Sequence, residues 1–242
     1  MSKVHLFLSR FLGRRALIGL AVLVLLGLCH APILRLLAWP LMTSDSSAAC
    51  DYFCIHGGEL GTEGFETFDR AAAWYAEAPG RKILLLLPRT SRIVEVGAVP
   101  SFEQTCRGQL SKRRVPPADV WPICGEARNV WEEARAMDDW LKGHPGSMVR
   151  LACSTVSSGR LRYALRKVLG PGDAQRVRLA ISSDPGRPIE SWWRSRNGVK
   201  DFMYGWLELI YAWTVGDDTR PLSPGAADFQ REIRARIGEA PL

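Results

Sequence analysis

Residues 82–87 read Lys-Ile-Leu-Leu-Leu-Leu, a continuous apolar run with the length of a β-strand. Because apolar and polar residues do not alternate in this run, we expect both faces of the strand to be covered, as in a parallel sheet. A weaker run lies at 119–123. Three further runs of the same kind lie at 51–56, 148–153 and 176–181.

Segments with a helical period separate these runs, and several have recognisable ends. Ser101 and Gln104 form a capping-box pattern, and Gly170-Pro171 ends a later segment. The alternation of strands and helices predicts right-handed connections and a mostly parallel sheet sandwiched between helices. The expected helices cover 65–77, 101–113, 127–142, 157–169 and 199–215.

The composition of the 242 residues, 47% hydrophobic and 24% charged, suits one globular domain and disfavours a disordered or multi-pass membrane protein. A formal net charge of +7 suggests nucleic-acid binding at first, but the charge is unevenly distributed. Residues 1–40 hold five basic residues and no acid, whereas the remainder holds 27 basic and 25 acidic residues. The body is therefore nearly neutral, and we expect no nucleic-acid partner.

Residues 16–34 are almost continuously apolar, and 19 residues suffice to cross a hydrocarbon core of about 30 Å as a helix. Basic residues before this run place the N-terminus in the cytoplasm. A cleaved signal peptide is the alternative, but Leu28 before Cys29 and Pro32 after Ala31 disfavour processing, so we expect an uncleaved single-pass anchor. The expected organisation is a cytoplasmic N-terminus at 1–15, an anchor at 16–38, a linker at 39–49, an α/β domain at 50–216 and a tail at 217–242.

Five of the six cysteines lie in the domain that we expect outside the cytoplasm, where disulfide bonds can form. Cys106 and Cys124 enclose a proline-containing loop and are the pair that we expect first. No CxxC motif is present, and His56 and His144 alone are too few ligands, so no metal centre is predicted.

In a parallel α/β sheet, ligands bind beyond the carboxyl ends of the strands. Gly57 and Gly58 follow the first strand and allow close approach of a phosphate or ribose, although a plain tight turn explains them equally well. Ser154, Ser157 and Arg160 follow the fourth strand. Their hydroxyls, the amides of a helix start and the guanidinium predict an anion site, whereas a simple N-cap is the alternative.

Glu126, Asn129 and Glu133 are spaced three and four residues apart, so one helix face would present carboxylate and amide groups to the same cleft. General acid–base chemistry is one interpretation, and acids that stabilise a helix start are the other. The chain has neither a GxxxxGK[ST] nor a GxSxG motif, so neither a P-loop ATPase nor a serine hydrolase is predicted.

Six motifs stand in a characteristic order: Cys50 to Gly58, Asp69-Arg70-Ala71-Ala72 with Tyr75, Val115-Pro116-Pro117, Asn129 to Ala134, Ser154 to Arg160, and Trp192-Trp193. In this order and spacing the chain resembles the YdcF-like family over about residues 49–215. The resemblance implies a Rossmann-like three-layer α/β sandwich with a mostly parallel sheet, preceded by one transmembrane helix. It also implies a periplasmic domain on the bacterial inner membrane that serves envelope polysaccharide or peptidoglycan biogenesis.

Together with the residue patterns, this resemblance implies an anionic ligand, nucleotide- or lipid-phosphate-like, with envelope-assembly proteins or a lipid-linked glycan as partners; no cofactor is identified. The chain departs from the family where Ser157 replaces a histidine, Thr67 an arginine and Glu59 a glycine. A non-catalytic scaffold that recruits partners near Trp192 and Trp193 is therefore the alternative. The expected base is Glu133, and the expected ligand-binding residues are Gly57, Gly58, Arg70, Asn129, Ser154, Ser157 and Arg160.

Overall fold

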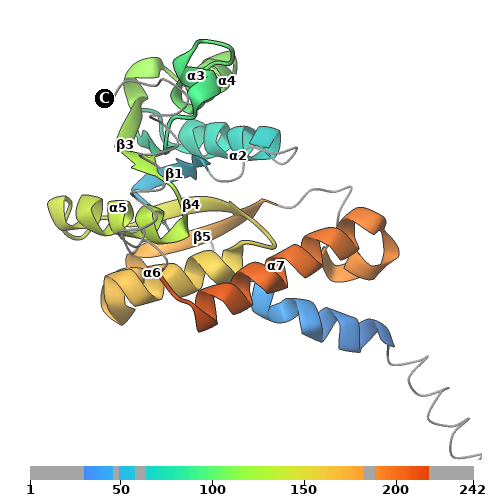
Figure 1. Ribbon diagram of the computed structural model, residues 1–242. Helices are drawn as coiled ribbons and strands as arrows, with labels where there is room; N and C mark the ends of the chain where they lie inside the picture. Colours follow the sequence, from blue (N-terminus) through green and yellow to red (C-terminus); the bar gives the residue numbers. More distant parts are fainter. Residues whose placement is uncertain (1–29, 46–48, 58–63, 183–188, 218–242) are drawn as a thin grey trace, which may run out of the picture.

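The computed structural model describes residues 30–45, 49–57, 64–182 and 189–217. Its centre is a five-stranded sheet in the order β3-β2-β1-β4-β5, in which every neighbouring pair of strands is parallel (Figure 1). The expected parallel α/β architecture is confirmed, and the order is that of a doubly wound sheet. The strands are β1 (Tyr52–His56), β2 (Lys82–Pro88), β3 (Val120–Ala127), β4 (Val149–Ser154) and β5 (Val177–Ser182).

Helices cover both faces of the sheet, as the continuous apolar strands require. Ile83 and Leu85 of β2 contact one apolar cluster, and Leu84 and Leu86 contact the other. Figure 1 shows α2 and α4 on the first of these faces, α5 and α6 on the second, and α7 beside α6. The helices are α2 (Gly64–Glu77), α3 (Arg92–Glu95), α4 (Phe102–Lys112), α5 (Val130–Gly143), α6 (Ser158–Asp173) and α7 (Arg196–Thr214), with 3₁₀ turns η1 (Trp39–Leu41), η3 (Pro117–Asp119), η4 (Ala174–Arg176) and η5 (Ile189–Arg194).

Seven of the ten helix ends lie within one residue of their expected positions. α5 begins three residues later than expected, α7 begins three residues earlier, at Arg196, and α6 ends four residues later, at Asp173. The capping box of Ser101 and Gln104 opens α4, and a kink with a φ of 76° at Gly170 interrupts α6. The helix expected from residue 127 instead begins at Val130. The reason is that Ala127 still pairs with Pro88 in the sheet and Asn129 caps the helix.

The chain between the predicted anchor and the sheet packs against the domain. Residues 30–38 are helical, and Ala38 and Leu41 are fully buried in a cluster with Phe202 and Leu209 of α7. The backbone N–H of Thr43 donates to the Ser158 hydroxyl at 2.8 Å. Part of the segment expected as a linker therefore lies against the domain.

Among the residues that the structure describes, no helix is both long and apolar enough to cross a membrane. The expected anchor at 16–38 falls mostly within residues 1–29, which lie outside the described residues. The transmembrane anchor and its orientation therefore stay predictions.

The expected Cys106–Cys124 disulfide is wrong for this structure. Cys106 is a free thiol on α4, fully buried between this helix and the sheet. Its burial, with a smaller contribution from the charge of Glu103, raises the pKa of the thiol to about 12. Cys106 therefore acts as a small apolar core residue in the α2–α4 layer.

Candidate active site at the carboxyl ends of β1 and β4

The strand order reverses direction between β1 and β4, where a doubly wound sheet opens its ligand crevice. His56 is the last residue of β1 and Ser154 is the last residue of β4, so both side chains stand at this point. Both are buried, with 7% and 8% of their surface exposed. The topology therefore brings polar groups to the one edge of the sheet where ligands ordinarily bind.

The central contact of the site joins His56 to Glu133. The Nδ1 atom of His56 lies 3.3 Å from Glu133 Oε1, and the two side chains are 7% and 11% exposed. Glu133 stands in the first turn of α5, where its backbone N–H donates to the Asn129 carbonyl. A carboxylate beside one ring nitrogen orients the imidazole and fixes its tautomer, which suits the other nitrogen to exchange a proton.

Glu133 also affects the pKa of a buried thiol, that of Cys54. Cys54 lies two residues before His56 on β1 and is fully buried. Burial, and then the negative charge of Glu133, raises the pKa of the Cys54 thiol well above its ordinary value. Cys54 is thus a neutral thiol that packs below the pair and is no nucleophile.

A cavity of about 250 Å³ lies next to this pair. α6 contributes its N-cap residue Ser157, which is buried, and Arg160, which is partly exposed. Arg160 forms an ion pair with Glu208 of α7 at 3.2 Å, and its Nε is buried without a hydrogen-bond partner among the described residues. The lining residues are His56, Pro88, Ala127, Arg128, Asn129, Val130, Glu133, Ser157, Arg160 and Leu161.

In the serine-rich segment at the end of β4, some side chains lie at the cavity and others stabilise the packing of the chain. The hydroxyls of Ser154 and Ser157 lie 3.0 Å apart, so Ser154 supports the lining residue from below. Ser158 instead donates to the Leu41 carbonyl at 3.0 Å. A Cβ atom at Gly159 would lie 2.2 Å from the Pro40 carbonyl oxygen. Glycine is therefore needed here, because the backbone at Pro40 packs directly against α6.

Gly57 has a packing role that its sequence position did not reveal. A Cβ atom on Gly57 would lie 2.4 Å from both Cδ and Cγ of Pro88 at the end of β2. The space beside Gly57 is thus filled by the neighbouring strand, not left open to a ligand. Gly58 lies outside the described residues.

Arg70 does not reach the cavity. It lies on α2, which covers the opposite face of the sheet, and its guanidinium contacts Glu66 and the Ile181 carbonyl. Spacing along the chain could not show which face α2 would cover. Of the expected charged groups, Arg160 and Glu133 line the same cavity and Arg70 does not.

Asn129 lines the cavity and also has a structural role. Its side-chain oxygen accepts the N–H groups of Trp131 and Glu132, both at 3.0 Å, as an N-cap does. The helix face expected to carry Glu126, Asn129 and Glu133 does not form, because Glu126 belongs to β3. The acid–base candidate therefore depends on Glu133 alone from that group.

His56 is the site residue that the sequence analysis missed. In the sequence it stands out only as one of two histidines that are too few to bind a metal. Its position as the last residue of a buried strand, directly before two glycines, is the signal that could have identified it. Its partner could not be foreseen, since Glu133 is 77 residues further along the chain.

In the described part of the chain, no group of three or more His, Cys, Asp or Glu residues could hold a metal ion. In comparisons with known proteins, no family model and no curated protein matches the chain. The chemistry of the site is therefore argued from its own groups around one cavity: a buried imidazole–carboxylate pair, the Ser157 hydroxyl, and the guanidinium groups of Arg128 and Arg160.

Proposed function

We propose that this protein is a membrane-anchored, YdcF-like envelope protein whose domain binds a phosphate-bearing ligand at the carboxyl ends of β1 and β4. The observation that carries the proposal is that Arg160 and the buried His56–Glu133 pair line one cavity at the point where the strand order reverses. The resemblance described above supports the envelope setting, with the domain on the periplasmic side of the bacterial inner membrane.

The cavity has the groups that an anion needs. Arg160 supplies a charge and hydrogen-bond donors, and the Ser157 hydroxyl at the start of α6 adds a further donor. Arg128 is exposed at the rim and adds a second positive charge. A phosphate bound here would displace Glu208 from Arg160 and take its place as the partner.

The His56–Glu133 pair adds acid–base chemistry to binding. With Glu133 beside Nδ1, His56 would accept a proton through Nε2 from a hydroxyl group or water next to the phosphate. The deprotonated oxygen would attack the phosphorus atom and the bond from phosphorus to the leaving oxygen would break. The imidazolium, stabilised by Glu133, would then give its proton to that leaving oxygen. In this proposal His56 transfers the proton and Glu133 positions His56. The sequence alone had predicted Glu133 as the base.

A thermal-shift screen of the full chain in detergent tests the proposal. The probes are inorganic phosphate, phenyl phosphate, adenosine monophosphate and farnesyl phosphate, because they share a phosphate and differ in the attached group. A ligand at a hundred times its Kd adds about 2.7 kcal/mol to the free energy of unfolding, enough to raise the melting temperature by several degrees. If no probe raises the melting temperature, the proposed ligand class is wrong.

A second candidate is a scaffold that kept the fold and binds envelope-assembly proteins or a lipid-linked glycan without catalysis. Two observations favour it: Pro88 fills the space beside Gly57, and Glu208 already occupies Arg160. Complementation of a deletion strain separates the two candidates, with surface polysaccharide as the readout. An enzyme requires His56 and Arg160, so His56→Ala and Arg160→Ala would fail to complement, whereas a scaffold would tolerate both variants.

A further inference from the structure

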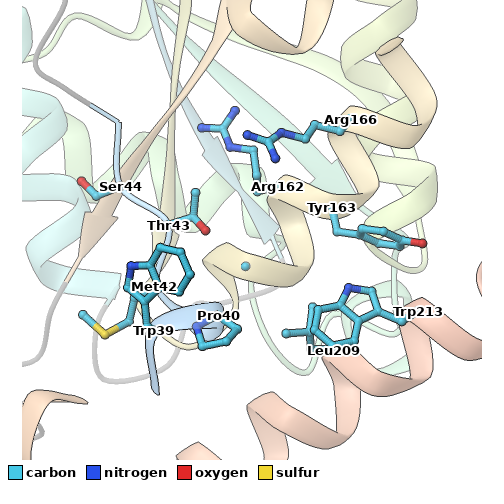
Figure 2. A pocket seen from close by; sticks show the side chains of 11 residues that line it. Trp39, Pro40, Met42, Thr43, Ser44, Arg162, Tyr163, Arg166, Leu209 and Trp213 are labelled. Carbon is cyan, nitrogen blue, oxygen red and sulfur yellow. The ribbon is translucent and has the colours of Figure 1, made fainter. Parts of the chain in front are cut away.

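A second cavity, of about 490 Å³, lies between the chain at 39–44, α6 and α7. Figure 2 shows that its two ends differ in chemistry. Arg162 and Arg166 of α6 lie together at one end, and Leu209 and Trp213 of α7 lie at the other, near Pro40. None of the described residues that line it is acidic.

The two arginines have different roles. Arg162 is buried, pairs with Asp45 and donates to the Val177 carbonyl at 3.0 Å, so it is part of the fold. Burial, and then the charges of Arg166 and Arg178, lowers the pKa of Arg162 to about 10. Arg166 is exposed and forms no ion pair with any described residue. The polar end of the cavity is therefore positively charged, with one guanidinium available to a ligand.

The apolar end adjoins an unusually apolar surface, which we call the α7 surface. Residues 30–38 and α7 lie side by side (Figure 1), and the Trp206 indole N–H of α7 donates to the Leu37 carbonyl at 3.0 Å. From η5, which precedes α7, the Trp192 indole N–H donates to the Leu34 carbonyl at 3.0 Å. Both helices turn large apolar side chains outward, and soluble monomers rarely expose so many together. The α7 surface comprises Ile33, Leu36, Leu37, Trp39, Met203, Tyr204, Leu207, Ile210, Tyr211 and Trp213, all more than 40% exposed.

We propose that the second cavity binds the phosphate headgroup of an anionic membrane lipid while the α7 surface lies in the bilayer interface. The order of groups matches that of a lipid: Arg166 meets the phosphate, and Leu209 and Trp213 accompany the chains toward the bilayer. The position of the surface supports a lipid as the occupant, because the apolar run at 16–34 leads directly into the helix at 30–38. Exposed tryptophan and tyrosine are typical of membrane interfaces.

This inference depends on the membrane attachment in the proposed function but not on the His56 cavity. The two cavities use different arginines of α6, Arg160 in the first and Arg166 in the second. A variant of one should therefore leave ligand binding at the other unchanged.

Photolabelling of the full chain in phosphatidylcholine nanodiscs tests the inference. The probe is phosphatidic acid with a diazirine near the phosphate, and the label is mapped by peptide mass spectrometry. We expect label within residues 42–44 and 162–166, which line the polar end of the cavity, and a loss of about tenfold in yield for Arg166→Gln, since one charge-assisted contact disappears. Arg166→Lys should keep most of the label, and Arg160→Ala should keep all of it.

Lys167→Gln is the matched control, because Lys167 is an exposed cation next to Arg166 that does not line the cavity. Its labelling should equal that of the wild type. Equal labelling of Arg166→Gln and wild type, or an equal loss in Lys167→Gln, would overturn the proposal. A competition experiment distinguishes a lipid phosphate from a free phosphate as the ligand. Unlabelled phosphatidic acid should suppress labelling. Suppression by inorganic phosphate alone would show that the cavity binds a soluble anion instead.

Discussion

Glu133 Oε1 lies 3.3 Å from Nδ1 of His56, and both side chains are nearly inaccessible to solvent. The contact joins the last residue of β1 to the first turn of α5. A buried polar pair of this kind holds its members in one geometry, and removing either member leaves the other without that partner.

Glu133→Ala should lower the free energy of unfolding by about 1–3 kcal/mol, because the buried His56 loses its carboxylate. His56→Ala should also destabilise, and the double variant should show a coupling free energy of about 1 kcal/mol in urea unfolding. Asp139→Ala, on the solvent side of the same helix, should change stability by less than about 0.5 kcal/mol. Strict additivity of Glu133→Ala and His56→Ala would show that the contact has no energetic role.

Gly57→Ala should destabilise the protein by about 1–3 kcal/mol, since the new methyl group would lie 2.4 Å from Pro88. Pro88→Ala in the same chain should recover part of this loss by making room. Gly108→Ala is the control, because that exposed helical glycine has nothing within 4 Å of an added Cβ and should gain about 0.5–1 kcal/mol. Equal melting temperatures for Gly57→Ala and wild type would refute the packing role assigned to Gly57.

Cys106 should be unreactive in the folded protein, because burial raises its pKa to about 12 and excludes reagents. A thiol reagent at pH 8 should modify it only after unfolding, and dithiothreitol should leave the melting temperature unchanged. Mass spectrometry of the unreduced protein checks this directly, and a peptide that joins Cys106 to another cysteine would contradict the free thiol.

Stability should fall as the pH drops below about 4, in part because of Asp119. A hydrogen bond from Lys82, and then one from Tyr75, lowers the pKa of Asp119, so the unfolded chain binds a proton there before the folded chain does. The stabilisation is complete above the unfolded pKa and is lost as the pH falls through the folded pKa. Asp119→Asn should flatten the acid limb of a plot of melting temperature against pH; an unchanged limb would show that Asp119 does not contribute.

Much of the fold could be predicted from the sequence, because strands covered on both faces appear as continuous apolar runs. The run at 82–87 became β2, and four further strands lie close to their expected positions. β3 gave the weakest signal because Pro122 and Gly125 interrupt its apolar pattern. α5 begins later than its apolar pattern predicts, because Asn129 caps the helix and does not belong to it.

The site was harder to predict than the fold, because its contacts join residues that are far apart in the sequence. Glu133 and Arg160 were expected and do line one cavity, but His56 was overlooked because its partner comes from a distant helix. Arg70 was expected in the site from its motif in the family resemblance, and the sequence could not show that α2 covers the other face of the sheet. Gly57 was expected in a ligand-binding loop. Its packing against Pro88 could not be foreseen, because the two residues meet only when β1 and β2 pair.

The central claim is that Arg160 binds phosphate beside the His56–Glu133 pair, and calorimetric titration of the full chain with inorganic phosphate tests it most directly. Arg160→Ala should weaken binding about tenfold or more, because a charge-assisted contact is lost. Glu208→Gln should strengthen binding a fewfold, because it removes the ion-pair partner that competes for Arg160. Arg70→Ala, with the same loss of charge on the other face, should bind like the wild type. Identical affinities for wild type and Arg160→Ala, or no heat from any of the four proteins, would contradict the account.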